Sequence, residues 1–177
     1  MVWVVANKLK TILEKRGYRV VMTKTAEEQF VRNRARAEVA NHAHAALMVR
    51  LHCDSGSESG IAVFVPEKQG VSEGVRGPTT EVIASSIRMG KVFHAALVKS
   101  LAGSLADRGL RPDAASRVGA RQGALTGSVF SHVPVVLVEI CVLSSPHDER
   151  FIITDSGKNA VARALANAVD AAVLKHD

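Results

Sequence analysis

The sequence predicts a single α/β domain, in which a mostly parallel sheet is covered by helices on both faces. Segments with helical periodicity alternate along the chain with short apolar segments. This alternation is typical of parallel sheets that are buried on both faces. The chain has 177 residues, with no internal repeat and no linker composition. That length fits one hydrophobic core, so the predicted domain spans residues 1–177.

Composition narrows the class of protein further. Hydrophobic residues make up 47% of the chain and charged residues 23%, which excludes disorder, coiled coil and collagen as descriptions of the whole. No apolar stretch approaches the roughly 18 residues of a membrane span, and no basic-then-apolar signal segment opens the sequence. The net charge of +6 suggests an anionic partner without saying which one. The two cysteines, Cys53 and Cys141, are most simply small buried residues, and a single bridge stays open as an alternative.

The first half of the chain begins with a helix, because Val5, Leu9 and Leu13 fall on one face and Gly17 stands where a terminating glycine is expected. The pattern next predicts, in order, a strand at Tyr18–Thr23, a helix at Ala26–Ala43, and strands at Ala46–Cys53 and Ile61–Val65. Asp54–Gly60 is a loop by composition. Glu67–Thr80 has no apolar period, so we expect a long surface loop at the rim of the site.

The second half contains one strongly apolar strand between helices. The pattern predicts a helix at Glu81–Leu105, a buried strand at Val133–Leu143 and a closing helix at Gly157–Lys175. Arg117–Gly127 is rich in glycine and is interpreted as a strand and a turn. Ligands of open α/β sheets bind beyond the carboxyl ends of strands, so the polar residues there are the candidate site residues.

Glu139 is the most informative of these polar residues, because it interrupts a strand that should be entirely apolar. A buried carboxylate without a partner responds with a raised pKa or a bound cation. Such a group suits general acid/base catalysis. The alternative is a structural glutamate that pairs with a buried arginine or with backbone donors.

His52 lies at the end of the other strongly apolar strand. It becomes a candidate site residue because Glu139 is expected at the same edge of the sheet. Two groups at strand ends of one sheet can face a common cleft, so we expect their side chains within about 10 Å of each other. An imidazole and a carboxylate there suit a metal-assisted hydrolase. His42 and His44 lie a strand's length away and cannot share a metal with His52. Cys53 points to the opposite face from His52, which argues against a Cys–His dyad.

Other function classes find little support. Arg32, Arg34 and Arg36 form a basic run, but few aromatic residues accompany it, and the sequence has no P-loop, GxGxxG or zinc-finger spacing. Nucleic-acid binding is therefore not expected. A serine hydrolase is not expected either, since no GxSxG elbow exists.

Three runs of sequence together resemble a known family. They are LEKRGYRVVMTK, RAEVANHAHAALMVRLHCDS and VPVVLVEICVLSSPHDERFI. In this order they resemble the zinc-dependent N-acetylmuramoyl-L-alanine amidases, the cell-wall hydrolase family often called amidase type 3. The resemblance extends from the first helix to the last.

The resemblance implies an α/β fold and a hydrolase that cleaves the amide between N-acetylmuramic acid and L-alanine of peptidoglycan. It implies one zinc ion held by two histidines and a glutamate, with a second glutamate as catalytic acid/base. By position, His52 matches a zinc ligand and Glu139 matches the catalytic glutamate, which would deprotonate a zinc-bound water and protonate the leaving amine. The substrate implies an extracellular, periplasmic or cell-wall location.

The chain also departs from the family pattern. The family's first strand, with its zinc histidine, and its zinc glutamate would lie before Met1, since this chain begins inside the first helix. One protein ligand does not hold a catalytic zinc, which typically needs three. We therefore expect the 177-residue chain to bind zinc weakly or not at all, and not to release stem peptides from peptidoglycan.

Three interpretations follow from the sequence. The first is an amidase domain without its leading segment, which the pair His52 and Glu139 favours. The second is a non-catalytic relative that binds peptidoglycan or regulates a partner, which the missing ligands favour. The third is a basic α/β domain that binds an anionic polymer, for which a strong salt dependence of nucleic-acid binding would be needed. Oligomeric state does not follow from the sequence.

Overall fold

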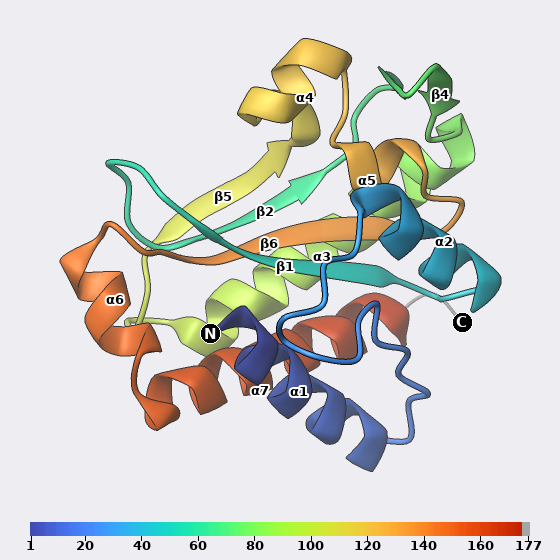
Figure 1. Ribbon diagram of the computed structural model, residues 1–177. Helices are drawn as coiled ribbons and strands as arrows, with labels where there is room; N and C mark the ends of the chain where they lie inside the picture. Colours follow the sequence, from blue (N-terminus) through green and yellow to red (C-terminus); the bar gives the residue numbers. More distant parts are fainter. Residues whose placement is uncertain (175–177) are drawn as a thin grey trace.

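A four-stranded sheet forms the centre of the computed structural model, which describes residues 1–174 (Figure 1). The strand order is β1–β6–β2–β5, with β1 at Met48–Asp54, β6 at Val135–Val142, β2 at Ile61–Val65 and β5 at Asp107–Pro112. The pairs β1/β6 and β2/β5 are parallel, and β2 runs antiparallel to β6. The predicted class, a mostly parallel α/β sheet with helices on both faces, is confirmed.

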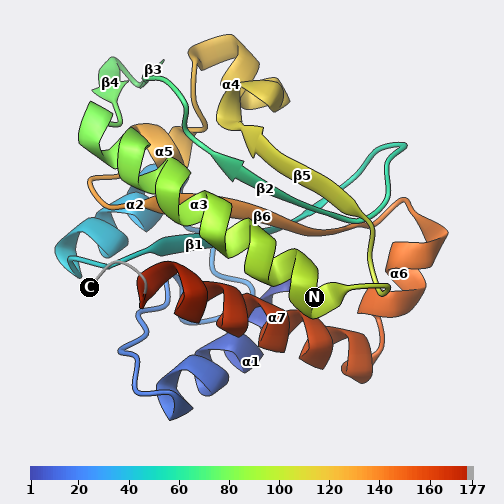
Figure 2. The same cartoon turned by 180° about the vertical axis from the view of Figure 1, so that it is seen from behind.

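Three long helices cover one face of the sheet: α1 (Val2–Lys15), α3 (Thr80–Leu101) and α7 (Asp155–Val173) (Figures 1 and 2). Their apolar sides form the main core with the sheet, in which Phe93, Leu97 and Leu165 are almost fully buried. Threonine hydroxyls cap α3 and α7 by accepting backbone N–H groups, which is a favourable way to begin a helix. No helix among residues 1–174 is long and apolar enough to cross a lipid bilayer.

The other face carries shorter elements. α2 (Asn33–His42) packs beside Met48, Phe130 and Val135, and α5 (Thr126–Val129) follows Leu125 over the middle of the sheet. The turn η1 (Asp113–Ala115) and α4 (Arg117–Gln122) follow β5. α6 (Pro146–Ile152) follows β6 and contacts α7, and its Ile152 belongs to the main core rather than to this face. The thinner cover on this face leaves polar groups of β1 and β6 near the surface.

The first helix ends where the sequence predicts. Gly17 adopts a φ of 89°, its N–H donates to Glu14 O at 3.0 Å, and the N–H of Tyr18 donates to Leu13 O at 3.1 Å. These two bonds form a Schellman motif, for which glycine pays no steric penalty.

The chain between α1 and α2 differs from the prediction. Tyr18–Thr23 forms no strand, because a strand needs a neighbouring backbone and β1 pairs only with β6 among the described strands. The helix expected from Ala26 begins only at Asn33. The residues before it are polar or exposed, with Phe30 at 83% exposure, so no buried face stabilises an earlier turn.

The expected surface loop at Glu67–Thr80 contains a hairpin of β3 (Gly70–Ser72) and β4 (Val75–Gly77). Its two loop residues, Glu73 and Gly74, both have positive φ, as a type I′ turn requires. The hairpin packs against α4 and α5 beyond the far end of β2, which runs antiparallel to β6. The predicted place of this segment at the rim of the site is therefore wrong.

The segment Arg117–Gly127 is helical rather than strand and turn, and the strand β5 precedes it. β5 reads DRGLRP and lacks apolar alternation because it is an edge strand. The predicted strands at Ala46–Cys53, Ile61–Val65 and Val133–Leu143 are confirmed. The predicted helix at Glu81–Leu105 is shorter, since α3 ends at Leu101. The last helix is described to Val173, and Lys175 lies outside the described residues.

Candidate functional site

The register of the sheet places His52 directly beside Glu139. They are partner residues of the adjacent parallel strands β1 and β6. Neighbouring strands lie about 4.8 Å apart, and partner residues project from the same face. Ala62 of β2 is the partner of Glu139 on its other side, so a small side chain leaves room above the carboxylate. The prediction that the two groups lie close together is confirmed.

The carboxyl group of Glu139 lies in a partly buried, largely unpartnered position. Its Oε2 is buried and has no hydrogen-bond partner within residues 1–174. Burial, with a further contribution from the charge of Asp54, raises the pKa of Glu139 to about 7, although Arg108 and Arg50 act in the opposite direction. A carboxyl group with that pKa can take up and release a proton near neutral pH.

His52 has the opposite shift. The protein atoms around the imidazole, and then the charges of Arg50 and Arg36, lower the pKa of His52 to about 4. His52 is nevertheless exposed to solvent. Its neutral form at physiological pH keeps a nitrogen lone pair available as a metal ligand or hydrogen-bond acceptor.

Arg50 is a buried member of the same face that the sequence prediction missed. It lies two residues before His52, and its Nη2 donates to Asn33 Oδ1 at 3.3 Å. Its Nη1 has no hydrogen-bond partner within residues 1–174, and burial lowers the pKa of its guanidinium. An arginine inside the apolar run MVRLHC was the signal that could have identified it, by the reasoning applied to Glu139.

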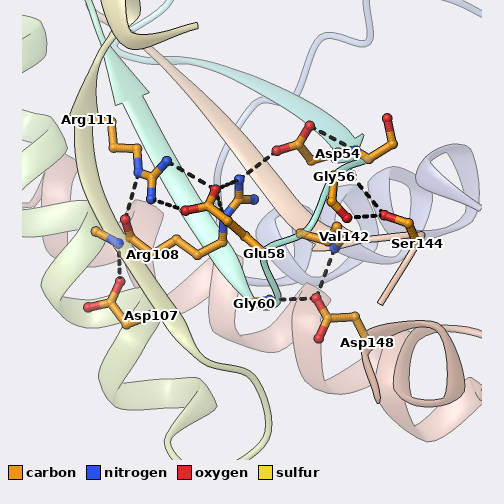
Figure 3. Close-up of polar contacts among 12 residues, drawn as sticks. Asp54, Gly56, Glu58, Gly60, Asp107, Arg108, Arg111, Val142, Ser144 and Asp148 are labelled. Atoms are coloured by element: carbon orange, nitrogen blue, oxygen red, sulfur yellow. Dashed lines mark hydrogen bonds and ion pairs between the residues drawn. The ribbon is translucent and has the colours of Figure 1, made fainter. Parts of the chain in front are cut away.

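A second group of charges lies past the end of β1 (Figure 3). Arg108 of β5 donates to Asp54 Oδ2 at 2.7 Å and to Glu58 Oε2 at 2.6 Å. Arg111 binds the other oxygen of Glu58 at 2.8 Å, and these two arginines lower the pKa of Glu58 to about 2. The cluster joins the loop after β1 to the outermost strand and brings charges of both signs near Glu139.

Asp148 of α6 holds the loop after β1 in place through hydrogen bonds (Figure 3). This fully buried carboxylate accepts the N–H of Gly60 at 2.6 Å and the N–H of Val142 at 2.9 Å. It also accepts the hydroxyl of Ser59 at 2.5 Å. The loop of residues 55–60 and the end of β6 are therefore held together at the edge of the sheet that carries His52.

A cavity of about 880 Å³ lies along β1, and His52 is among its lining residues. Its walls come from β1, α1, the extended segment of residues 18–24 and parts of α2 and α7. Arg36, Arg50, His52 and Cys53 are among its lining residues, whereas Glu139 is not. The open side of β1 thus faces a space large enough for a ligand of the usual size for protein pockets.

The described residues do not form a complete metal site. Within residues 1–174, no group of three His, Cys, Asp or Glu side chains could hold a metal ion. His94 contacts Asp107 at 2.8 Å, and His147 contacts Asp148 at 3.3 Å. His42 and His44 precede β1, as predicted. His52 is therefore a single candidate ligand.

A partly buried carboxyl group of raised pKa beside a potential metal ligand, at the strand ends of an α/β sheet, is typical of a hydrolase. The comparisons with known proteins identify which kind. The sequence pattern of the N-acetylmuramoyl-L-alanine amidase family, amidase type 3, matches residues 1–171. The chain belongs to this family. No curated protein sequence matches the chain at a significant level.

Solved structures with similar folds are also amidases. Ami1 from Mycobacterium smegmatis has a TM-score of 0.80 and 20% identity, over 98% of this chain and 75% of that one. AmiC2 of Nostoc punctiforme has a TM-score of 0.74 and 20% identity, over 98% and 80%. The CwlD amidase from Clostridioides difficile, solved in complex with the GerS lipoprotein, has a TM-score of 0.72 and 17% identity, over 98% and 84%. At these identities the likeness concerns the fold.

Proposed function

We propose that this protein is a peptidoglycan hydrolase that cleaves the amide between N-acetylmuramic acid and L-alanine, with Glu139 as the catalytic acid/base. The observation that carries the proposal is the pairing of His52 with Glu139 in register across β1 and β6. Family membership over residues 1–171 supports the same reaction class. The substrate places the protein at the cell wall, in an extracellular or periplasmic compartment.

Amide hydrolysis needs one group that removes a proton from water and returns it to the leaving amine. Glu139, with a pKa of about 7, can perform both transfers near neutral pH. Its unpartnered oxygen supports this role, since a structural carboxylate would normally accept hydrogen bonds. Arg108 and Arg50 favour the ionised form that accepts the proton of water, and Asp54 favours the protonated form that then donates it to the leaving amine.

Zinc is the cofactor that the family resemblance implies, and His52 is its one candidate ligand here. The described residues do not fit a catalytic zinc by themselves, because no group of three His, Cys, Asp or Glu side chains within residues 1–174 could hold the ion, and a catalytic zinc typically needs three protein ligands. We infer that the remaining ligands come from outside residues 1–174. A zinc ion so held supplies Lewis-acid polarisation of the scissile carbonyl.

A second candidate function rests on that same shortage of ligands. A relative that binds peptidoglycan without cleaving it would need neither the zinc nor the acid/base, and could regulate another hydrolase. The carboxyl of Glu139 argues against it, because a partly buried acid with an unpartnered oxygen destabilises the fold, and acid/base catalysis accounts for its presence.

The experiment compares two proteins on purified muropeptides, with cleavage followed by mass spectrometry. The first is the 177-residue chain. The second is the same chain extended at its amino end by the strand, histidine and glutamate of a solved family member. We expect no release of L-alanyl peptides by the first and zinc-dependent, chelator-sensitive release by the second.

One result would overturn the inference about the zinc ligands, and another would overturn the proposed function. Chelator-sensitive cleavage by the 177-residue chain would mean that its zinc ligands have been misplaced. A folded, zinc-loaded extended protein that binds muropeptides and never cleaves them would favour the non-catalytic alternative. The extended His52→Ala variant is the control, and should lose both zinc and turnover.

A further inference from the structure

We propose that Cys53 and Cys141 form a reversible intramolecular disulfide that joins β1 to β6 directly behind His52 and Glu139. These are the only two cysteines in the sequence. They are far apart along the chain, and the fold brings them together at the bulge between the adjacent strands β1 and β6, where the two thiols interact. Both are free thiols in the structure. The proposal is independent of the function proposed above.

An irregularity in the sheet is what brings the two side chains to the same face. His52 pairs with Glu139, yet Asp54 pairs with Val142, so one residue of β1 faces two residues of β6. This is the geometry of a β-bulge. In a regular ladder Cys141 would share the face of Glu139, whereas the bulge turns it into the core that Cys53 also packs against.

The spacing of the strands suits a disulfide. Neighbouring strands lie about 4.8 Å apart, which falls within the range of roughly 4.4–6.8 Å between the Cα atoms of bridged cysteines. Both residues belong to strands held by backbone ladders on either side of the bulge. Bridging therefore needs rotation of two side chains and little movement of the backbone.

The two thiols differ in access, which sets the order of the chemistry. Cys53 lines the cavity beside β1, while Cys141 is fully buried. With a low-molecular-weight disulfide as oxidant, the Cys53 thiolate attacks one sulfur and expels a thiolate, forming a mixed disulfide. Cys141 then gives up its proton, attacks the sulfur of Cys53 and expels the second small thiol. Two protein thiols lose two electrons and two protons, and one small disulfide becomes two small thiols.

The bridge would tie together the strand positions that carry the candidate site. Cys53 is the neighbour of His52, and Cys141 lies two residues after Glu139. The cross-link also closes a long loop and so restricts the unfolded chain. We therefore expect the oxidised protein to melt at a higher temperature than the reduced protein.

The test treats the reduced 177-residue protein with oxidised glutathione and counts thiols after denaturation, alongside intact mass and a thermal melt. The expected product is a monomer that has lost both thiols and two hydrogens, carries no glutathione, melts higher and reverts with dithiothreitol. Retention of two thiols, or arrest at a glutathione adduct, would overturn the proposal. So would a bridge between two chains.

Single variants separate the two steps. Cys141→Ser should accumulate a stable glutathione adduct on Cys53, because the resolving thiol is gone. Cys53→Ser should remain unmodified, because Cys141 is buried. An equal extent of adduct on both variants would contradict the proposed order of attack. Should either variant fail to fold, the thiol count of the unmutated protein still decides the proposal.

Discussion

Glu139 is a residue whose unusual environment can be predicted from the sequence. A carboxylate inside VPVVLVEICVL contradicts the pattern of a buried strand, and that contradiction is enough to identify it from the sequence alone. Arg50 contradicts its strand in the same way, but it escapes prediction because a basic side chain near a strand end resembles a solvated one. Its burial depends on α2 and α5, which fold over it from distant parts of the chain.

The pH dependence of stability tests the environment of Glu139. Its pKa of about 7 in the folded protein lies above the ordinary value of 4.5. The stability linked to its protonation is complete below about pH 4.5 and is lost as the pH rises through about 7. Glu139→Gln removes this loss, so the variant should be about 1–2 kcal/mol more stable than the wild type at about pH 8, after allowance for solvent screening.

Urea unfolding at about pH 4 and about pH 8 measures this difference, which should nearly vanish at the lower pH. Glu149→Gln is the matched control, since it replaces an exposed carboxylate on α6. A Glu139→Gln variant that is less stable than the wild type at both pH values would show that the carboxylate makes structural hydrogen bonds.

At the scale of elements, the loop after β1 and the end of β6 act as one unit because Asp148 binds both. Asp148→Asn replaces one accepting oxygen by a donor that would face backbone N–H groups or a hydroxyl. We expect a loss of about 2–4 kcal/mol in the free energy of unfolding. Asp155→Asn, at an exposed position of α7, should cost at most about 1 kcal/mol. Equal costs in chemical denaturation would contradict this role of Asp148.

The entry into β2 depends on a glycine. Gly60 has a φ of 106°, and a Cβ there would lie 2.0 Å from Ala106 O, a backbone atom that cannot easily move. We expect Gly60→Ala to lower the melting temperature clearly, at a cost of about 2–4 kcal/mol. Gly56→Ala is the control, because a Cβ at Gly56 meets nothing within 4 Å. A stable Gly60→Ala variant would mean that this loop has another conformation.

The elements that could be predicted from the sequence are those whose signal is local. Gly17 ends α1 through its own backbone freedom, and the apolar runs of β1, β2 and β6 reflect burial on both faces. β5 escaped prediction because an edge strand needs no apolar alternation. Tyr18–Thr23 was wrongly predicted as a strand because strand formation depends on a partner that the local pattern does not reveal.

At the scale of the whole molecule, the pairing of His52 with Glu139 is a consequence of topology. Parallel strands end at the same edge, so two isolated polar residues in the sequence become neighbours in the sheet. The face of the sheet they share is thinly covered. The opposite face, under α1, α3 and α7, carries most of the core.

The cavity along β1 predicts that backbone amides differ in their protection against hydrogen exchange from one part of the molecule to another. Residues 20–23 form one of its walls without belonging to a strand, while β6 is hydrogen-bonded on both sides. In hydrogen exchange, we expect the amides of residues 20–23 to exchange through local opening, with a low free energy of opening. The amides of β6 should exchange only when the whole molecule unfolds. Equal protection of the two segments would show that residues 20–23 are paired in solution.

The rate of muropeptide cleavage by the zinc-loaded, extended protein and by its Glu139→Gln variant tests the proposed site most directly. We predict that the substitution lowers turnover by at least about 10²-fold, as expected for loss of a general acid/base, while zinc content stays the same. Turnover by the Glu139→Gln variant at the wild-type rate, with zinc bound, would show that another residue carries the acid/base step.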